Sequence, residues 1–194
     1  MKKVLNLISK TTTAVLFGLL LSLSAGQSYA QIAKTGSTTT LKDALKTMLQ
    51  AEGAKSMKKL TVAVSGQQSS ALMDKYGVDT EGSYTVYNGT LADDAVMGSV
   101  IIVSQDGKEG PLQVLVAVKP DGKVYDIGFT VFGEDKGKPA LNWNFLKQFI
   151  GKTAAQSIKI GDDVDGISGA TWTSTSISTA VKRALAIHKE FVTQ

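Results

Sequence analysis

The stretch from Gly98 to Phe132 reads GSVIIVSQDGKEGPLQVLVAVKPDGKVYDIGFTVF and predicts three successive β-strands. Its apolar residues alternate or run together, and two turn signals, Asp106-Gly107 and Pro120-Asp121-Gly122, separate the strands. Strands joined by such short turns are antiparallel, because a parallel pair needs a crossover of a dozen or more residues. The residues expected to share a face are, in the second strand, Leu112, Val114, Val116 and Val118 and, in the third, Tyr125, Ile127, Phe129 and Val131.

Helical patterns lie on both sides of these strands. A capping box at Thr40-x-x-Asp43 predicts a helix to Gly53, and residues 67–76 predict a second helix that ends at Gly77. A short strand is expected at 60–64, another at 84–87, and a helix at 140–150. The last helix is expected to begin near Ser174, with a stripe that includes Ile177, Val181 and Leu185. The predicted fold class is therefore α+β, an antiparallel β-sheet flanked by helices and ending in a C-terminal amphipathic helix.

The N-terminus has the three parts of a secretory signal peptide. Lys2, Lys3 and Lys10 precede the apolar run AVLFGLLLSL at 14–23, and Ser28-Tyr29-Ala30 is typical of a cleavage site. We therefore expect residues 1–30 to be removed and the protein to be periplasmic or extracytoplasmic, without a membrane span. The alternative is an uncleaved N-terminal anchor, although ten apolar residues are half the roughly 20 that a span needs.

The composition excludes several classes of protein. With 43% hydrophobic and 20% charged residues the chain is of ordinary globular type, and the absence of Cys excludes disulfides, Cys-ligated metal sites and thiol nucleophiles. The single His leaves little material for a His-based metal cage or a Ser-His-Asp triad. Residues 1–30 contain three Lys and no acidic residue, so the remainder is nearly neutral and indicates no nucleic-acid partner.

A loop of small residues and hydroxyls at 161–174 leads into the last helix. The start of a helix presents N–H groups without helical partners and a partial positive charge, which suit a phosphate. The alternative is that the Ser and Thr side chains simply cap the helix. Three aspartates, Asp162, Asp163 and Asp165, lack the spacing of a calcium loop, so no metal is expected. Asp165 is instead expected to shape the turn by binding backbone N–H groups, or to help present the loop.

This loop contains the pattern Asp165-x-x-Ser168-Gly169-Ala170-Thr171-x-Thr173, which resembles the flavinylation motif of the FMN-binding domain family. The family includes one subunit of the sodium-translocating NADH:quinone oxidoreductase and one subunit of the Rnf electron-transport complex. Two further stretches, 107–124 and 145–152, are similar to the paired strands and the helix of the family. Two departures are Glu109, where many relatives carry His, and the segment 132–137, which keeps only Glu134 and a later Gly of the family pattern.

The resemblance implies that a flavin transferase attaches FMN through its phosphate to the hydroxyl of Thr173. It places the cofactor among Asp165, Ser168, Gly169, Ala170, Thr171, Trp172, Thr173 and Ser174. Trp172 is expected either to stack on the flavin or to pack in the core, and Trp143 either to edge the flavin or to pack. Since the one His is distant, we expect the transferase to activate the hydroxyl of Thr173, and we expect that hydroxyl to lie exposed in a loop.

The resulting hypothesis divides the chain into four parts: a signal peptide (1–30), a linker (31–39), a helical N-terminal part (40–82) and an FMN-binding domain (83–194). The predicted function is an exported carrier with covalent FMN that transfers electrons between a membrane donor and another redox protein. Two alternatives stay open: a non-flavinylated binding or structural module, and a flavin-dependent reductase of a small acceptor. His188, on the apolar stripe of the last helix, is expected to be a partly buried histidine with its hydrogen bonds satisfied, and not a redox or ligand residue.

Overall fold

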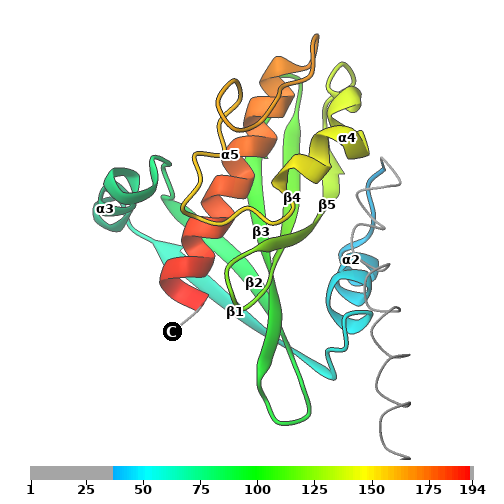
Figure 1. The fold of residues 1–194 in the computed structure, drawn as a ribbon, viewed down its shortest axis with the longest axis vertical. Coiled ribbons are helices and arrows are strands. Elements are labelled where there is room, and N and C mark those ends of the chain that lie inside the picture. Colours follow the sequence, from blue (N-terminus) through cyan, green and yellow to red (C-terminus); the bar gives the residue numbers. More distant parts are fainter. Residues whose placement is uncertain (1–36, 193–194) are drawn as a thin grey trace, which may run out of the picture.

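The computed structural model describes residues 37–192 of the chain, so the predicted signal peptide and most of the predicted linker lie outside the described residues. Its centre is one antiparallel sheet of five strands in the order β1-β2-β3-β4-β5 (Figure 1). The strands are β1 (Ser56–Val64), β2 (Gly82–Thr90), β3 (Val96–Asp106), β4 (Pro111–Val118) and β5 (Val124–Phe132). Each strand pairs with the next along the chain, as the short turns predict. The predicted α+β fold class is confirmed.

Helices cover both faces of the sheet. The long helix α5 (Thr171–Ile187) continues into a π-helical turn at His188–Val192 and packs on one face (Figure 1). On the other face lie α2 (Leu41–Leu45) and the helical segment Lys46–Gln50 that follows it. Strand β4 supplies both cores, because its alternate side chains point to opposite faces. Leu112, Val114, Val116 and Val118 lie in the core beneath α5, as predicted, whereas Leu115 and Ala117 contact the α2 side.

The face predicted for β5 is wrong for Tyr125. The pairing of β4 with β5 shifts register between Ala117 and Val118, so one extra residue is inserted in β5 at this point. Tyr125 therefore lies in the core beneath α2, while Ile127 and Phe129 lie beneath α5. A second register shift lies between Gln113, which pairs with Val131, and Val114, which pairs with Phe129. The side chain of Val131 is exposed. Strict alternation is lost at each bulge, which is why a period of two misassigned these side chains.

The first described segment combines helices with a strand of the sheet. Thr40 caps α2 by accepting a hydrogen bond from the N–H of Asp43 (3.1 Å), as the capping box predicts. Helix α3 (Gly66–Tyr76) ends at Gly77, also as predicted. Between them β1 pairs with β2 over its full length, so the interval 40–82 is not helical throughout and the sheet begins at Ser56.

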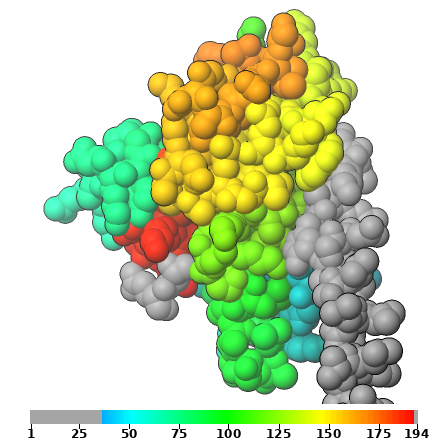
Figure 2. All heavy atoms as spheres, in the orientation of Figure 1, coloured from blue at the N-terminus to red at the C-terminus, as the bar shows by residue number. Residues whose placement is uncertain are grey.

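After β5 the chain covers one end of α5 with short elements. The predicted helix at 140–150 is three pieces: a 3₁₀ turn (Lys138–Leu141), α4 (Trp143–Leu146) and a second 3₁₀ turn (Lys147–Phe149). Irregular chain then leads to α5, and in Figure 2 the yellow and orange atoms of this region hide much of that helix. No helix within residues 37–192 combines the length and the apolar character needed to cross a membrane.

Candidate functional site

The candidate site lies where three segments meet at the beginning of α5. These are the first turn of α5, the turn between β3 and β4, and the segment that follows β5. The hydrogen bonds that join them span 25 and 39 residues of the chain, so tertiary packing assembles the site. The structure begins α5 at Thr171 rather than near Ser174, so Thr173 belongs to the first helical turn and not to a loop.

Thr173 is buried, which corrects the expectation of an exposed hydroxyl. Its residue surface is 2% exposed, and its Oγ1 donates a hydrogen bond to Oε2 of Glu134 (2.7 Å). The physical reason is that Thr173 lies on the side of α5 that faces the rest of the protein, as does Ile177 one turn later. The side chain implied to carry the cofactor therefore has a protein partner already.

Glu134 is a buried carboxylate held by hydrogen bonds. It is 3% exposed, and its Oε1 accepts from the backbone N–H of Glu109 (2.6 Å) and of Gly110 (3.3 Å) in the β3–β4 turn. Burial by itself would raise the pKa of Glu134, but these N–H groups and the Thr173 hydroxyl outweigh it and hold that pKa below its usual value. No Lys or Arg of residues 37–192 forms an ion pair with Glu134. The carboxylate is thus ionised at neutral pH, and Thr173 must be the donor.

Two glycines permit this close packing. A Cβ added to Gly107 would lie 2.2 Å from Oε1 of Glu134, and one added to Gly137 would lie 2.3 Å from Oγ1 of Thr173. Real side chains do not approach so closely, so both positions need a residue without a Cβ. Gly137 covers the Thr173 hydroxyl directly. The Gly that follows Glu134 in the sequence pattern therefore has a steric role at this site.

The remaining motif residues divide into buried and exposed groups. Ala170 precedes α5 and is buried, but it provides no side-chain cap for the helix. Ser174 is fully buried, and its Oγ donates to the carbonyl of Ala170 (2.9 Å) and accepts from the N–H of Ile167 (3.1 Å). Ser168, Gly169 and Thr171 are at least partly exposed. The structure therefore brings the motif to one helix terminus, with Ser174 shaping the preceding loop.

Asp165 does not shape the turn with its carboxylate. Its exposed side chain makes no hydrogen bond within residues 37–192, and only its backbone is held, by the side chain of Gln148. Asp163 has the predicted role instead, because its carboxylate accepts from the N–H of Lys159 (2.9 Å) and pairs with Lys152 (2.9 Å). Burial opposes these contacts, yet they lower the pKa of Asp163 to about 2. Presentation of the loop by Asp165 stays a prediction.

Trp172 is exposed and lines a cleft beside the first turn of α5. Its residue surface is 61% exposed, which excludes the core position that was one of its two expected roles. The cleft has a volume of about 560 Å³, within the range of small-molecule sites. It is lined by Gln105, Asp106, Lys108, Thr171, Trp172, Thr175, Ser176 and Thr179. Thr173 itself lies on the buried side of the helix and does not line this cleft.

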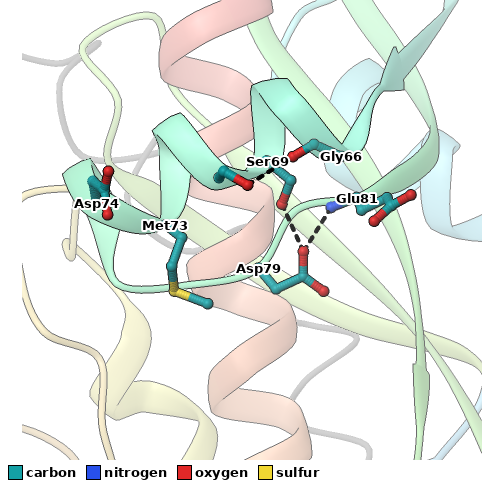
Figure 3. A pocket seen from close by; sticks show the side chains of 7 residues that line it. Gly66, Ser69, Met73, Asp74, Asp79 and Glu81 are labelled. Atoms are coloured by element: carbon teal, nitrogen blue, oxygen red, sulfur yellow. Dashed lines mark hydrogen bonds between the residues drawn. The ribbon is translucent and has the colours of Figure 1, made fainter.

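A second hollow, between α3 and the start of β2, is unrelated to the motif (Figure 3). Its carboxylates are Asp74, Asp79 and Glu81. The carboxylate of Asp79 already accepts hydrogen bonds from the hydroxyl of Ser69 (2.6 Å) and from the N–H of Glu81 (3.0 Å). In the described part of the chain, no group of three or more His, Asp or Glu is arranged to hold a metal ion. Nothing connects this hollow with a ligand.

The segment that contains the site matches a known protein family. Residues 107–186 match the model of a family described as FMN-binding domain. This segment of the chain is similar to the FMN-binding domain family. It includes the β3–β4 turn, Glu134 and the first turn of α5, so all three segments of the site lie within it. The match begins later than the predicted boundary at residue 83, and α2, β1, α3, β2 and β3 lie outside it.

Among solved structures, the chain is similar to a subunit of the Na⁺-translocating NADH-quinone reductase from Parabacteroides distasonis. The two are 19% identical, with 71% of this chain and 78% of that chain covered and a TM-score of 0.45. A search of curated proteins finds no match.

Sequence reasoning missed the hydrogen bond between Glu134 and Thr173. Glu134 and Thr173 are separated by 39 residues, and no local period links them. The available signal was the Glu and the later Gly that the segment 132–137 retains from the family pattern. The partly buried Trp143 packs against the core beneath α5, the second of its two expected roles. His188 lies at the other end of α5 and is 2% exposed, so it is buried more completely than the partly buried position expected.

Proposed function

We propose that the FMN-binding domain carries FMN as a phosphoester on the hydroxyl of Thr173 and that the protein transfers electrons. The observation that carries the proposal is the placement of Thr173. It lies in the first turn of α5, inside the matched domain, with its hydroxyl hydrogen-bonded to a buried ionised carboxylate. A hydroxyl that accepts a phosphoryl group acts as a nucleophile, and a neighbouring carboxylate is the kind of group that activates one. The residues present therefore fit the attachment of FMN.

The surroundings of Thr173 suit both ends of FMN. Ala170 leaves the start of α5 without a side-chain cap, so the N–H groups of the first turn and the helix dipole are available to the phosphate. Trp172 offers an exposed aromatic face in the neighbouring cleft, where the flavin ring would lie. Bound there, FMN supplies the one- and two-electron chemistry, and the chain supplies attachment and orientation.

Covalent attachment agrees with the predicted export of the protein. A cofactor bound weakly outside the cytoplasm would be lost by dilution, whereas a phosphoester retains it. We propose that a flavin transferase modifies the chain after export, and that the partners in electron transfer are a membrane donor and a second extracytoplasmic redox protein. Trp172 is 61% exposed, so a flavin ring stacked on it would keep one face reachable from solvent and would give little selectivity for a small substrate. We therefore expect no appreciable turnover of small metabolites.

Mass spectrometry of the protein co-expressed with a flavin transferase tests this function. We expect a mature chain that begins at Gln31 and is heavier by one esterified FMN. Thr173→Ala should carry no flavin through denaturing electrophoresis, and Thr173→Ser should retain some because its nucleophilic oxygen survives. Flavin retained by the Ala variant would move the site to Thr171 or Thr175. An intact Met1 in a membrane fraction would favour the N-terminal anchor.

One observation favours the alternative of an unmodified binding module. The hydroxyl of Thr173 is buried and already hydrogen-bonded, which is also what a purely structural threonine would show. The same experiment separates the two functions, since an unmodified mass in the presence of an active transferase would support the module.

A further inference from the structure

Attachment of a phosphoryl group to Thr173 requires its hydroxyl to lose a proton, and a base of this chain already accepts that hydrogen. We propose that Glu134 is a catalytic residue of the attachment reaction, contributed by the acceptor protein. The inference rests on the proposed attachment at Thr173. It revises the expectation that the transferase alone must activate the hydroxyl.

The geometry around Glu134 is that of a positioned base. Its Oε2 lies 2.7 Å from Oγ1 of Thr173, within the reach required of a general base. Its Oε1 is held by the N–H groups of Glu109 and Gly110, so the β3–β4 turn orients the carboxylate independently of α5. His188 offers no substitute, because it follows Thr173 by about four helical turns, roughly 20 Å along the axis. Glu134 is thus the base in place at the hydroxyl.

The step is a phosphoryl transfer with a defined donor. A phosphoester forms from an alcohol only if phosphorus carries a good leaving group, so the donor is a flavin dinucleotide, the phosphoanhydride of FMN with a nucleotide. Oγ1 of Thr173 forms the new bond to the flavin phosphorus, and the P–O bond of the pyrophosphate breaks. The bonding pair leaves on the nucleoside monophosphate, and the hydroxyl proton passes to Oε2 of Glu134.

The same proton transfer removes an electrostatic conflict. An ionised Glu134 next to a new phosphodiester would place two negative charges side by side in a buried site, where their repulsion is weakly screened. The charge of the new phosphodiester raises the pKa of Glu134 from its lowered value in the flavin-free chain, so the protonated carboxyl group is neutral and can donate a hydrogen bond to a phosphate oxygen. Glu134 thereby serves the reaction before and after the new bond forms.

Access to the hydroxyl requires one local movement. Gly137 covers Oγ1, and the chain around it is exposed at Asp135, Lys136 and Lys138. Glu134 lies at the other end of this segment and is anchored to the β3–β4 turn. Displacement of the Gly137 end by the transferase would therefore uncover Thr173 while Glu134 stays beside it.

Kinetics of attachment test the proposal, with purified transferase, flavin adenine dinucleotide and the unflavinylated chain as acceptor. Glu134→Gln keeps the size of the side chain but cannot take up the proton, so we expect kcat to fall by about 100-fold or more with the KM for the acceptor unchanged. The matched control is Asp135→Asn, which removes the same charge from an exposed neighbour on the same segment. It should react as the wild type does.

Chemical rescue separates catalysis from structure. Glu134→Ala should be nearly inert, and formate, which supplies a carboxylate to the vacated space, should restore attachment; Thr173→Ala should show no rescue. Circular dichroism and thermal unfolding identify any variant that fails to fold. A wild-type kcat for Glu134→Gln, or a raised KM together with no formate rescue, would overturn the role of Glu134. A wild-type chain that takes up no flavin would instead overturn the proposed function.

Discussion

The hydroxyl of Thr173 has two roles that make different demands on its surroundings. As a hydrogen-bond donor it satisfies a buried carboxylate, and as the proposed attachment point it must become accessible to a flavin donor. An exposed hydroxyl could be removed at almost no cost in stability, but a buried partner of Glu134 cannot. The stability expected for variants of Thr173 changes accordingly.

We predict that Thr173→Ala lowers the free energy of unfolding of the flavin-free protein by about 1–3 kcal/mol, because it leaves the buried carboxylate of Glu134 without a donor. Thr173→Ser keeps the donor and loses one buried methyl group, so it should cost about 1 kcal/mol. Urea unfolding measures both. Thr175→Ala, an exposed neighbour bonded only to the carbonyl of Thr171, is the control and should change stability by less than about 0.5 kcal/mol. Equal stability of all three variants would contradict the hydrogen bond.

At the scale of elements, the bulge in β5 connects the sheet to the N-terminal helices. The bulge turns Tyr125 to the α2 side, where its hydroxyl donates to the carbonyl of Met48 (2.6 Å) and Lys119 lies over its ring, 4.3 Å from the centroid. The helical segment Lys46–Gln50 is thus tied to a strand residue that follows Met48 by 77 residues in the chain. Without the bulge, this side chain would point toward α5.

We predict that Tyr125→Phe destabilises the protein by about 1–3 kcal/mol, because the buried carbonyl of Met48 loses its hydroxyl donor while the ring still fills the core. Thermal or urea unfolding measures the change, and hydrogen exchange should show faster opening of Lys46–Gln50. Tyr87→Phe is a matched control, since the hydroxyl of the half-buried Tyr87 makes no hydrogen bond within residues 37–192. A loss for Tyr87→Phe as large as that for Tyr125→Phe would point to a general effect of the hydroxyl group.

At the scale of the whole molecule, the burial of His188 makes the stability depend on pH between its unfolded and folded pKa values. The residue is 2% exposed in the turn after α5, and burial, with a smaller contribution from Lys189, lowers its pKa to about 4; Asp121 opposes this shift. The unfolded chain binds a proton on this imidazole near pH 6.5, and the folded chain only near pH 4. Between these values the unfolded state holds more protons, so folding is weakened as the pH falls.

We therefore predict that the wild type loses up to about 3 kcal/mol of stability between pH 6.5 and pH 4 through His188. Urea unfolding at a series of pH values measures the slope, which His188→Leu should largely remove. Asp163 provides the internal comparison: its pKa is lowered, so its contribution is lost only as the pH falls from 3.8 toward 2. The loss of stability below pH 3.8 should persist in His188→Leu. If the free energy of unfolding of this variant fell as steeply as that of the wild type between pH 6.5 and pH 4, the burial of a neutral imidazole would be contradicted.

Elements with local signals were predictable from the amino-acid sequence. Asp106-Gly107 and Pro120-Asp121-Gly122 separate strands at the predicted places, and the box at Thr40 caps α2, because turns and caps depend on a few adjacent residues. The stripe of α5 was also predictable, since a helix repeats its face every 3.6 residues. The motif that ends at Thr173 led to the FMN-binding domain in the same way.

Tertiary structure alone decided the features that join distant segments. The burial of Thr173, its bond to Glu134 and the support from Glu109 arise where three parts of the chain pack together. The side of the sheet on which Tyr125 lies depends on a bulge set by pairing with the neighbouring strand. None of these features follows a local period or spacing. Packing can bring a side chain into contact with any part of the chain, so the residues next to it in the sequence do not identify its partner.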